Sequence, residues 1–215
     1  MSLSLPNGTT YAVASAYAAA IAVSAASNAT ECVLTTATNT YAIGDFIEFT
    51  SGWDNANLRV FRVKAAAATS VTLEGFDTTS TTLFPAGAGI GSVRKISTWQ
   101  NIPQVLSCDA SGGDAQYTTV SPIASKVDVN LPNGFSAMSL ALTIGDDPTL
   151  PHHAVLKAAS IAQTLMAVKA TLPNGGPLLA NGYCSFNETP TMAKGQVMAV
   201  KASFALLNMP VRYAT

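Results

Sequence analysis

Hydrophobic and polar positions alternate along much of the second half of the chain. Apolar residues stand at every second position from 127 to 131 in the run 124–131 and from 138 to 144 in the run 137–144, and Pro-Asn-Gly separates the two runs at 132–134. A period of two residues is typical of strands with one buried face, and Asn-Gly favours a tight hairpin turn. The pattern predicts a hairpin whose bulky face comprises Val127, Val129, Leu131, Met138, Leu140, Leu142 and Ile144.

The same period recurs toward the C-terminus. The run 165–172 alternates before a second Pro-Asn-Gly turn at 173–175, which predicts a second hairpin. The run 197–206 is the clearest strand in the chain. Its bulky face comprises Met198, Val200, Ala202, Phe204 and Leu206, and its other face comprises Val197, Ala199, Lys201, Ser203 and Ala205.

One short helix is predicted between the two hairpins, over 150–163. Pro151 suits a first helical turn, and Val155, Ala158, Ala159 and Ala162 give the helix an apolar stripe. Such a helix would cover the bulky face of the sheet. The other face of the sheet has small side chains and few charges, which suits the lining of an aqueous bore.

The N-terminal half is also rich in strands. Bulky residues at odd positions favour an extended segment over 11–26, although Val13, Tyr17 and Ile21 are also four residues apart among helix-favouring alanines. Four β-rich runs predict a small all-β module over 41–96, with its long loop at 78–91. These runs are 45–50, 58–64, 70–74 and 92–96.

Composition points to assembly. Of the 215 residues only 11% are charged while 48% are hydrophobic, a balance suited to a subunit that buries its surface against copies of itself. The net charge of −1 argues against tight binding of nucleic acid. Because the apolar run 11–26 is short and the first basic residue is Arg59, we expect no secretory signal and no membrane insertion.

The three cysteines show no metal-binding pattern. Cys32, Cys108 and Cys184 are widely spaced, with no Cys-x-x-Cys pair. We therefore interpret them as reduced packing residues.

A grouping of His152 and His153 with Asp146 and Asp147 is the strongest candidate for chemistry. It could hold a metal or supply a general base. Aspartates ahead of a helix more often cap it, however, and we favour that interpretation. The glycine-rich stretch 87–91 lacks the lysine of a phosphate-binding loop. The sequence therefore predicts no catalytic, cofactor-binding or metal-binding residue.

Four aromatic residues in the N-terminal half have two interpretations. Trp53, Phe61, Phe76 and Trp99 could form a sugar-binding platform, as in a carbohydrate-binding or adhesin module. Isolated aromatic residues in short strands more often belong to a core.

From Gln116 onward, the order of hairpin, helix, hairpin and terminal strand resembles the major tail tube proteins of long-tailed bacteriophages of the siphovirus type. The resemblance is strongest over 165–213. There it includes a Leu-Pro-Asn-Gly turn at 172–175, the Gly-Tyr step at 182–183, Gly-Gln-Val at 195–197 and a tail at 210–213.

The resemblance implies a structural virion protein with a mainly β, sandwich- or barrel-like tail tube fold. Hexameric rings would stack into a hollow tube for genome ejection, with each subunit adding strands to a continuous inner barrel. The chain would then divide into an N-terminal tube segment at 1–40, the inserted module at 41–96 and the tube domain at 97–215. The lumen-facing residues that we expect are Lys126, Asp128, Ser139, Ala141, Lys169, Lys201 and Ser203.

The same resemblance implies the partners and the location. The tape measure, tail terminator and distal tail proteins would bind the tube, and double-stranded DNA would pass without specific binding. Assembly would take place in the cytoplasm of the bacterial host. A tube of a contractile tail or of a secretion system remains an alternative, as does a hydrolase that uses the aspartate and histidine cluster.

Overall fold

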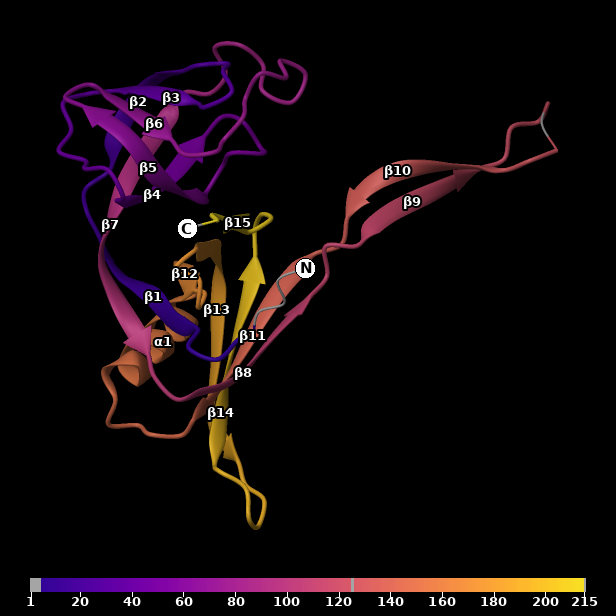
Figure 1. Cartoon of the computed structure of the whole chain (residues 1–215). Helices are drawn as coiled ribbons and strands as arrows, with labels where there is room; N and C mark the ends of the chain where they lie inside the picture. The colour runs from indigo at the N-terminus through magenta and orange to yellow at the C-terminus, as the bar shows by residue number, and fades with distance from the viewer. Residues whose placement is uncertain (1–4, 125, 215) are drawn as a thin grey trace.

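The computed structural model describes residues 5–124 and 126–214 and consists of a compact barrel, a longer sheet with one helix, and a projecting arm (Figure 1). Strands dominate the described residues, and α1 (Pro151–Ala162) is the single α-helix among them. The expected mainly β fold with one short helix is confirmed.

Six strands of the described residues close a barrel near the N-terminus. Each strand pairs with the next in the order β2-β3-β6-β5-β4-β7, and β7 returns to pair with β2. The strands are β2 (Ile21–Ala26), β3 (Val33–Thr36), β4 (Phe46–Ser51), β5 (Arg59–Ala67), β6 (Ser70–Leu73) and β7 (Gly91–Ile102). The barrel thus combines the four runs predicted within 41–96 with two strands that precede them.

The barrel has its own hydrophobic core. Trp53, Phe61 and Phe76 are at most 7% exposed, and Trp53 and Phe76 each contact the ring of Phe84. The indole N–H of Trp53 donates a hydrogen bond to the carbonyl of Pro85, 2.8 Å away. These three aromatic residues are core residues, so they do not form an exposed sugar-binding platform.

The segment 11–26 is extended, as the alternation favoured, and it forms two strands with a break at 18–20. Its first strand, β1 (Thr10–Tyr17), pairs with the second half of β7, so β7 belongs to both the barrel and the longer sheet. From β1 the sheet continues in the order β12-β13-β14-β11-β8. These strands are β8 (Val105–Ser111), β11 (Met138–Gly145), β12 (Leu165–Thr171), β13 (Pro177–Thr191) and β14 (Ala199–Leu206), and the short β15 (Val211–Arg212) pairs with β13.

The second predicted hairpin is confirmed and the first is wrong. β12 and β13 pair around the turn at 173–175, with Thr171 opposite Pro177. The Pro-Asn-Gly sequence at 132–134, however, lies inside β10 (Val129–Phe135), which pairs with β9 (Ala115–Val120). A register shift between Pro132 and Gly134 marks an irregularity of the ladder at this point, so the glycine conformation serves a bulge and not a turn.

Helix α1 lies close to the predicted position and packs on the sheet through a stripe that overlaps the predicted one in part. Pro151 occupies its first turn, and the αL residue Gln163 ends it. The buried side chains are His152, Leu156 and Ala159, whereas Ala158 and Ala162 of the predicted stripe are exposed. The predicted stripe is confirmed at Ala159, which is buried, and at Val155, which packs against the core, and it is wrong at Ala158 and Ala162. An alanine-rich helix is apolar on several sides, and the bulkiest side chains then decide which side is buried.

Candidate functional site

Four neighbouring strands, β13-β14-β11-β8, carry mostly small and polar side chains on one face, with Tyr183 as its large aromatic residue. The strand register aligns these side chains in rows across the sheet. The three rows, each from β8 to β13, are Ser111, Ser139, Ala205 and Tyr183; Asp109, Ala141, Ser203 and Ser185; and Ser107, Thr143, Lys201 and Asn187. We call these residues the small-residue face.

The opposite face of the same strands is apolar and is covered by the helix. Leu142, Ala202 and Phe204 are fully buried, and they belong to one core with Leu156 of α1. The Cys184 thiol lies in this core, and burial raises its pKa to about 11. Because the helix covers only one side of the sheet, the small-residue face is open to solvent in the isolated subunit.

Both side edges of the four strands are open in part. β8 pairs with β11 on one side and ends the sheet, and every residue from 106 to 111 is exposed. At the other edge, the pairing of β13 with β12 ends at Tyr183, so β13 extends beyond its neighbour. The Phe186 N–H there donates to the Ser160 hydroxyl of α1. Open strand edges are sites where a further strand can pair.

The arm consists of β9, β10 and the connection between them, residues 115–135. It projects from the body of the molecule (Figure 1), and every described residue in it is exposed. Gly112 and Gly113 precede it with positive φ angles, and a Cβ on Gly112 would lie 2.0 Å from the carbonyl oxygen of Ala137. The chain therefore needs glycine where the arm leaves the sheet.

Four of the seven residues predicted to face a lumen lie together. Ser139, Ala141, Lys201 and Ser203 all belong to the small-residue face. Lys126 and Asp128 lie between β9 and β10 in the arm, away from that face.

Lys169 also lies elsewhere, on β12. Its amino group is 4.6 Å from the centre of the Trp99 ring and 5.0 Å from that of Phe46, and burial lowers its pKa. It is therefore part of the junction between the barrel and the sheet.

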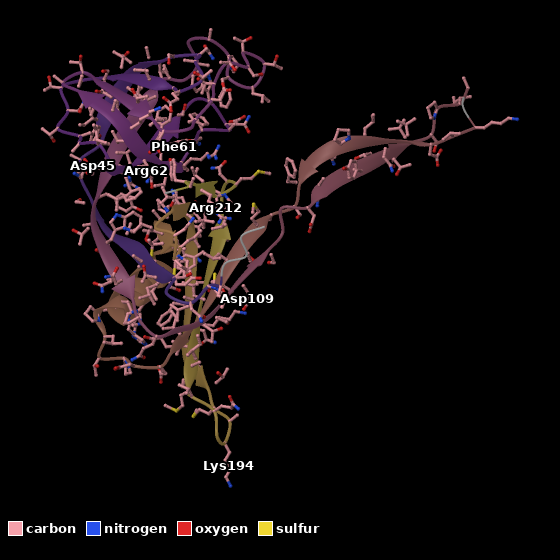
Figure 2. The ribbon with its side chains drawn as sticks, viewed as in Figure 1. Asp45, Phe61, Arg62, Asp109, Lys194 and Arg212 are labelled. Carbon is pink, nitrogen blue, oxygen red and sulfur yellow. The ribbon has the colours of Figure 1, made fainter. Side chains whose placement is uncertain are left out.

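The sequence reasoning missed Ser107, Asp109 and Ser111, which extend the small-residue face onto β8. Figure 2 labels Asp109 on this edge strand. The signal was present, since small or polar residues alternate with Leu106, Cys108 and Ala110. Cys108 is exposed, so it is not the packing residue that we predicted, whereas Cys32 and Cys184 are buried.

A buried polar cluster joins the barrel to the sheet. Glu48 of β4 is 1% exposed and pairs with Arg94 at 2.7 Å, while the Asn181 amide donates to its other oxygen at 3.0 Å. The Arg94 guanidinium lies 4.0 Å from the centre of the Tyr17 ring, and the Tyr17 hydroxyl accepts the N–H of Ala167. Burial raises the pKa of Tyr17 to about 12, so the hydroxyl stays protonated. These contacts hold the two parts in a defined orientation.

The histidine and aspartate grouping does not form the capped helix that we predicted. The N-cap residue is Leu150, without a side-chain cap, and Asp147 instead accepts two hydrogen bonds from Thr149. His152 is buried, and burial lowers its pKa, whereas the His153 imidazole lies 3.8 Å from Glu188. Across the described residues, no group of three or more His, Cys, Asp or Glu side chains is arranged to hold a metal ion.

Within residues 5–124 and 126–214 there is also no helix with the length and hydropathy needed to cross a membrane.

Comparison with known proteins identifies the family of this chain. A search of curated proteins found no match. The family model of the phage tail tube protein, TTP, matches residues 51–215, which include β5 to β15 and therefore the whole small-residue face. Because this match covers most of the chain, the chain belongs to the phage tail tube protein family.

Proposed function

We propose that this chain polymerises as stacked hexameric rings into the tail tube of a siphophage, through which the genome is ejected. The observation that carries the proposal is the four-stranded sheet with one face under a helix, one open face of mostly small side chains, an open edge at β8 and an edge at β13 that is open beyond Tyr183. A free subunit gains nothing from such a face, whereas a ring that pairs β8 with β13 of the next copy would turn it into a continuous inner wall.

The dimensions suit this role. Six copies contribute 24 strands, and a spacing of about 4.8 Å with a tilt of about 40° gives a barrel of about 45 to 50 Å in backbone diameter. A DNA duplex would pass through such a bore after side chains have narrowed it.

The charge of the wall suits passage without retention. Asp109 and Lys201 are the charged residues of the small-residue face, and they balance each other. With no excess of basic residues, the wall would not hold the phosphate backbone by counterion release. We therefore assign Asp109, Ser139, Ala141, Lys201 and Ser203 to the lumen, and we leave Lys126, Asp128 and Lys169 outside it.

The proposal includes the remaining features that the family implies. The protein acts without catalysis or a cofactor, and it assembles in the host cytoplasm. The tape measure protein would occupy the bore before ejection, and the terminator and distal tail proteins would bind the ends of the tube. The exposed apolar residues of the arm, among them Tyr117, Leu131 and Phe135, would be covered by neighbouring copies.

Electron microscopy of the purified protein tests the proposal. We expect hollow tubes with sixfold end views. Ala110→Lys puts a charged side chain on the open β8 edge and should block ring closure while the subunit still folds, because charged residues on edge strands oppose pairing. Ala65→Lys is the matched control, since Ala65 is also an exposed alanine in a strand, but lies on the barrel. Tubes from Ala110→Lys, or no tubes from the unmodified chain, would contradict the proposal.

A further inference from the structure

The loop between β13 and β14 forms a tip with exposed apolar side chains. We call residues 192–198 the tip segment, and Figure 2 shows Lys194 at its far end. Met192 is 70% exposed, Val197 69% and Met198 45%. A hydrogen bond from Gln196 N–H to the Ala193 carbonyl closes the turn. Three exposed apolar side chains on one short turn are typical of a contact that the isolated subunit does not make.

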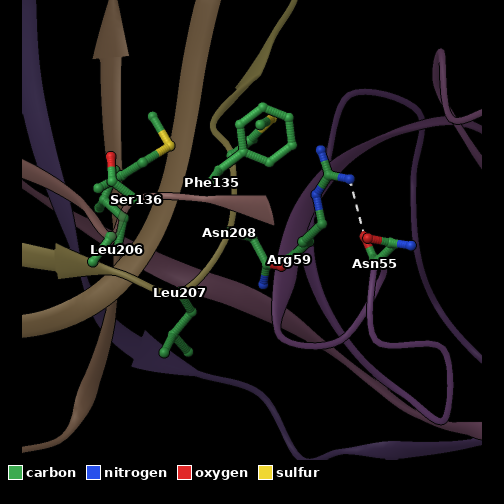
Figure 3. Close-up of a pocket in the computed structure, with 10 residues that line it drawn as sticks. Asn55, Arg59, Phe135, Ser136, Leu206, Leu207 and Asn208 are labelled. Atoms are coloured by element: carbon green, nitrogen blue, oxygen red, sulfur yellow. Dashed lines mark hydrogen bonds between the residues drawn. The ribbon is translucent and has the colours of Figure 1, made fainter. Parts of the chain in front are cut away.

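A pocket lies at the opposite end of the same strands. It has a volume of about 420 Å³, and Figure 3 shows the residues around it. Its apolar lining residues are Phe135, Met138, Leu206, Leu207 and Met209, and its polar ones include Asn55 and Arg59. We call it the arm-base pocket, because it lies where the chain passes from the end of β10, at the base of the arm, into β11.

Arg59 places a positive charge in the lining of the pocket. One terminal nitrogen donates to the Asn55 carbonyl at 3.0 Å, but the buried Nε has no hydrogen-bond partner among the described residues. The guanidinium lies 5.5 and 5.6 Å from the ring centres of Phe61 and Phe76, and burial lowers the pKa of Arg59. The Nε itself is enclosed, so the terminal nitrogens of Arg59 are the donors that a carbonyl oxygen of an entering turn could meet.

We infer that the tip segment of one copy docks in the arm-base pocket of a second copy in the next ring, an inference that rests on the proposed function. The strand pairing sets the geometry. Gly145 and Thr191 pair with Ala199 at the tip end, whereas Met138 pairs with Leu206 at the pocket end. Because the strands run between the two ends of the bore, stacking brings the tip end of one copy onto the pocket end of another.

The side chains of the tip segment fit the arm-base pocket better than those at the far end of the arm do. Met192 and Met198 are flexible and polarisable, so they can adapt to a lining that already contains Met138 and Met209. The Lys194 ammonium lies on a long stem and can reach water at the rim, away from Arg59. The far end of the arm also exposes Ile123 and Val127, but it carries the charges of Lys126 and Asp128 beside them. The arm also diverges from the strand direction (Figure 1).

Crosslinking between copies tests this contact in the full chain. The parent carries Cys108→Ser, because Cys108 is the exposed cysteine of the described residues. Lys194→Cys with Met209→Cys places thiols on the tip and in the pocket. A short bismaleimide should then give a ladder of dimers, trimers and longer chains in assembled tubes. The matched control replaces Met209→Cys with Ile43→Cys on the barrel, where Ile43 is 76% exposed, and it should give no ladder.

Two further variants test the same contact without introduced cysteines, which could themselves disturb assembly. Met192→Ser with Val197→Ser removes the apolar contact and should leave single rings that have lost stacking, whereas Lys194→Ser should stack as the parent does.

The outcomes separate the two proposals. The docking would be overturned if Lys194→Cys with Met209→Cys formed tubes but gave no ladder. It would also be overturned if Ile123→Cys with Met209→Cys gave a ladder, or if the double serine variant formed normal tubes. If the parent forms no tubes, the proposed function fails and the docking fails with it.

Discussion

A comparison of Ser203→Asp with Phe204→Asp tests the lumen assignment most directly. The two residues are adjacent on β14, so they have the same neighbouring strands and lie at about the same distance from the barrel. Their side chains point to opposite faces of the sheet. Phe204 is fully buried, with Leu140 and Cys184 on either side, whereas Ser203 is partly exposed between Ala141 and Ser185.

The expected costs differ by several kcal/mol. Removing a buried phenylalanine costs about 3 to 5 kcal/mol, and an unpaired buried carboxylate adds several more. That sum is comparable to the whole stability of a typical domain, which is about 5 to 15 kcal/mol, so Phe204→Asp should not fold. Asp at 203 should cost about 1 kcal/mol or less, because water solvates it and Lys201 lies two residues away on the same face.

The assay combines soluble yield, thermal unfolding followed by circular dichroism, and electron microscopy of tubes. Ser203→Asn and Phe204→Leu are controls that change shape without adding a charge. We expect tubes from Ser203→Asp and insoluble protein from Phe204→Asp. Equal loss from both aspartate variants would refute the assignment, since it would mean that neither face of β14 is in contact with water.

Three further predictions follow from single contacts. Gly112→Ala should destabilise the start of the arm and reduce tube formation, because the added Cβ meets the Ala137 carbonyl; normal assembly by electron microscopy would contradict this. Burial gives His152 a folded-state pKa below its usual 6.5, so its neutral form contributes fully to the unfolding free energy above pH 6.5. That contribution should be lost as the pH drops from 6.5 through the folded-state pKa. Urea unfolding should show this pH dependence, and His152→Leu should remove it. Glu48→Ala leaves Arg94, whose side chain is 36% exposed, without its partner and should cost about 1 to 3 kcal/mol in unfolding free energy, whereas no measurable loss would show that the cluster does not hold the junction.

Local patterns along the chain were sufficient for much of the secondary structure. The strands β11, β12 and β14 and the helix α1 were predicted because each strand has faces of very different size and the helix has proline in its first turn. The strands β4 to β7 were predicted because β-branched and aromatic residues are concentrated between turn residues. The resemblance to tail tube proteins depended on the order of these elements, and the family match confirms it.

The pairing of strands was predicted only where a hairpin joined neighbours. Pro-Asn-Gly at 173–175 forms a turn, but the same tripeptide at 132–134 lies within β10. Gly134 has a φ of +105°, and a glycine with positive φ occurs both in one class of bulge and in hairpin turns. The tripeptide therefore could not indicate which of the two it would form.

The sequence by itself determined which residues share a face of each strand, because side chains alternate along an extended backbone whatever lies beside it. Only the tertiary structure decided that β11 lies between β14 and β8, and that Asp109 therefore joins Ala141 and Ser203 in one row. It also decided that Lys169 packs against aromatic rings at the junction. These outcomes depend on contacts between segments far apart in the chain, and the period of a single strand carries no information about its neighbours.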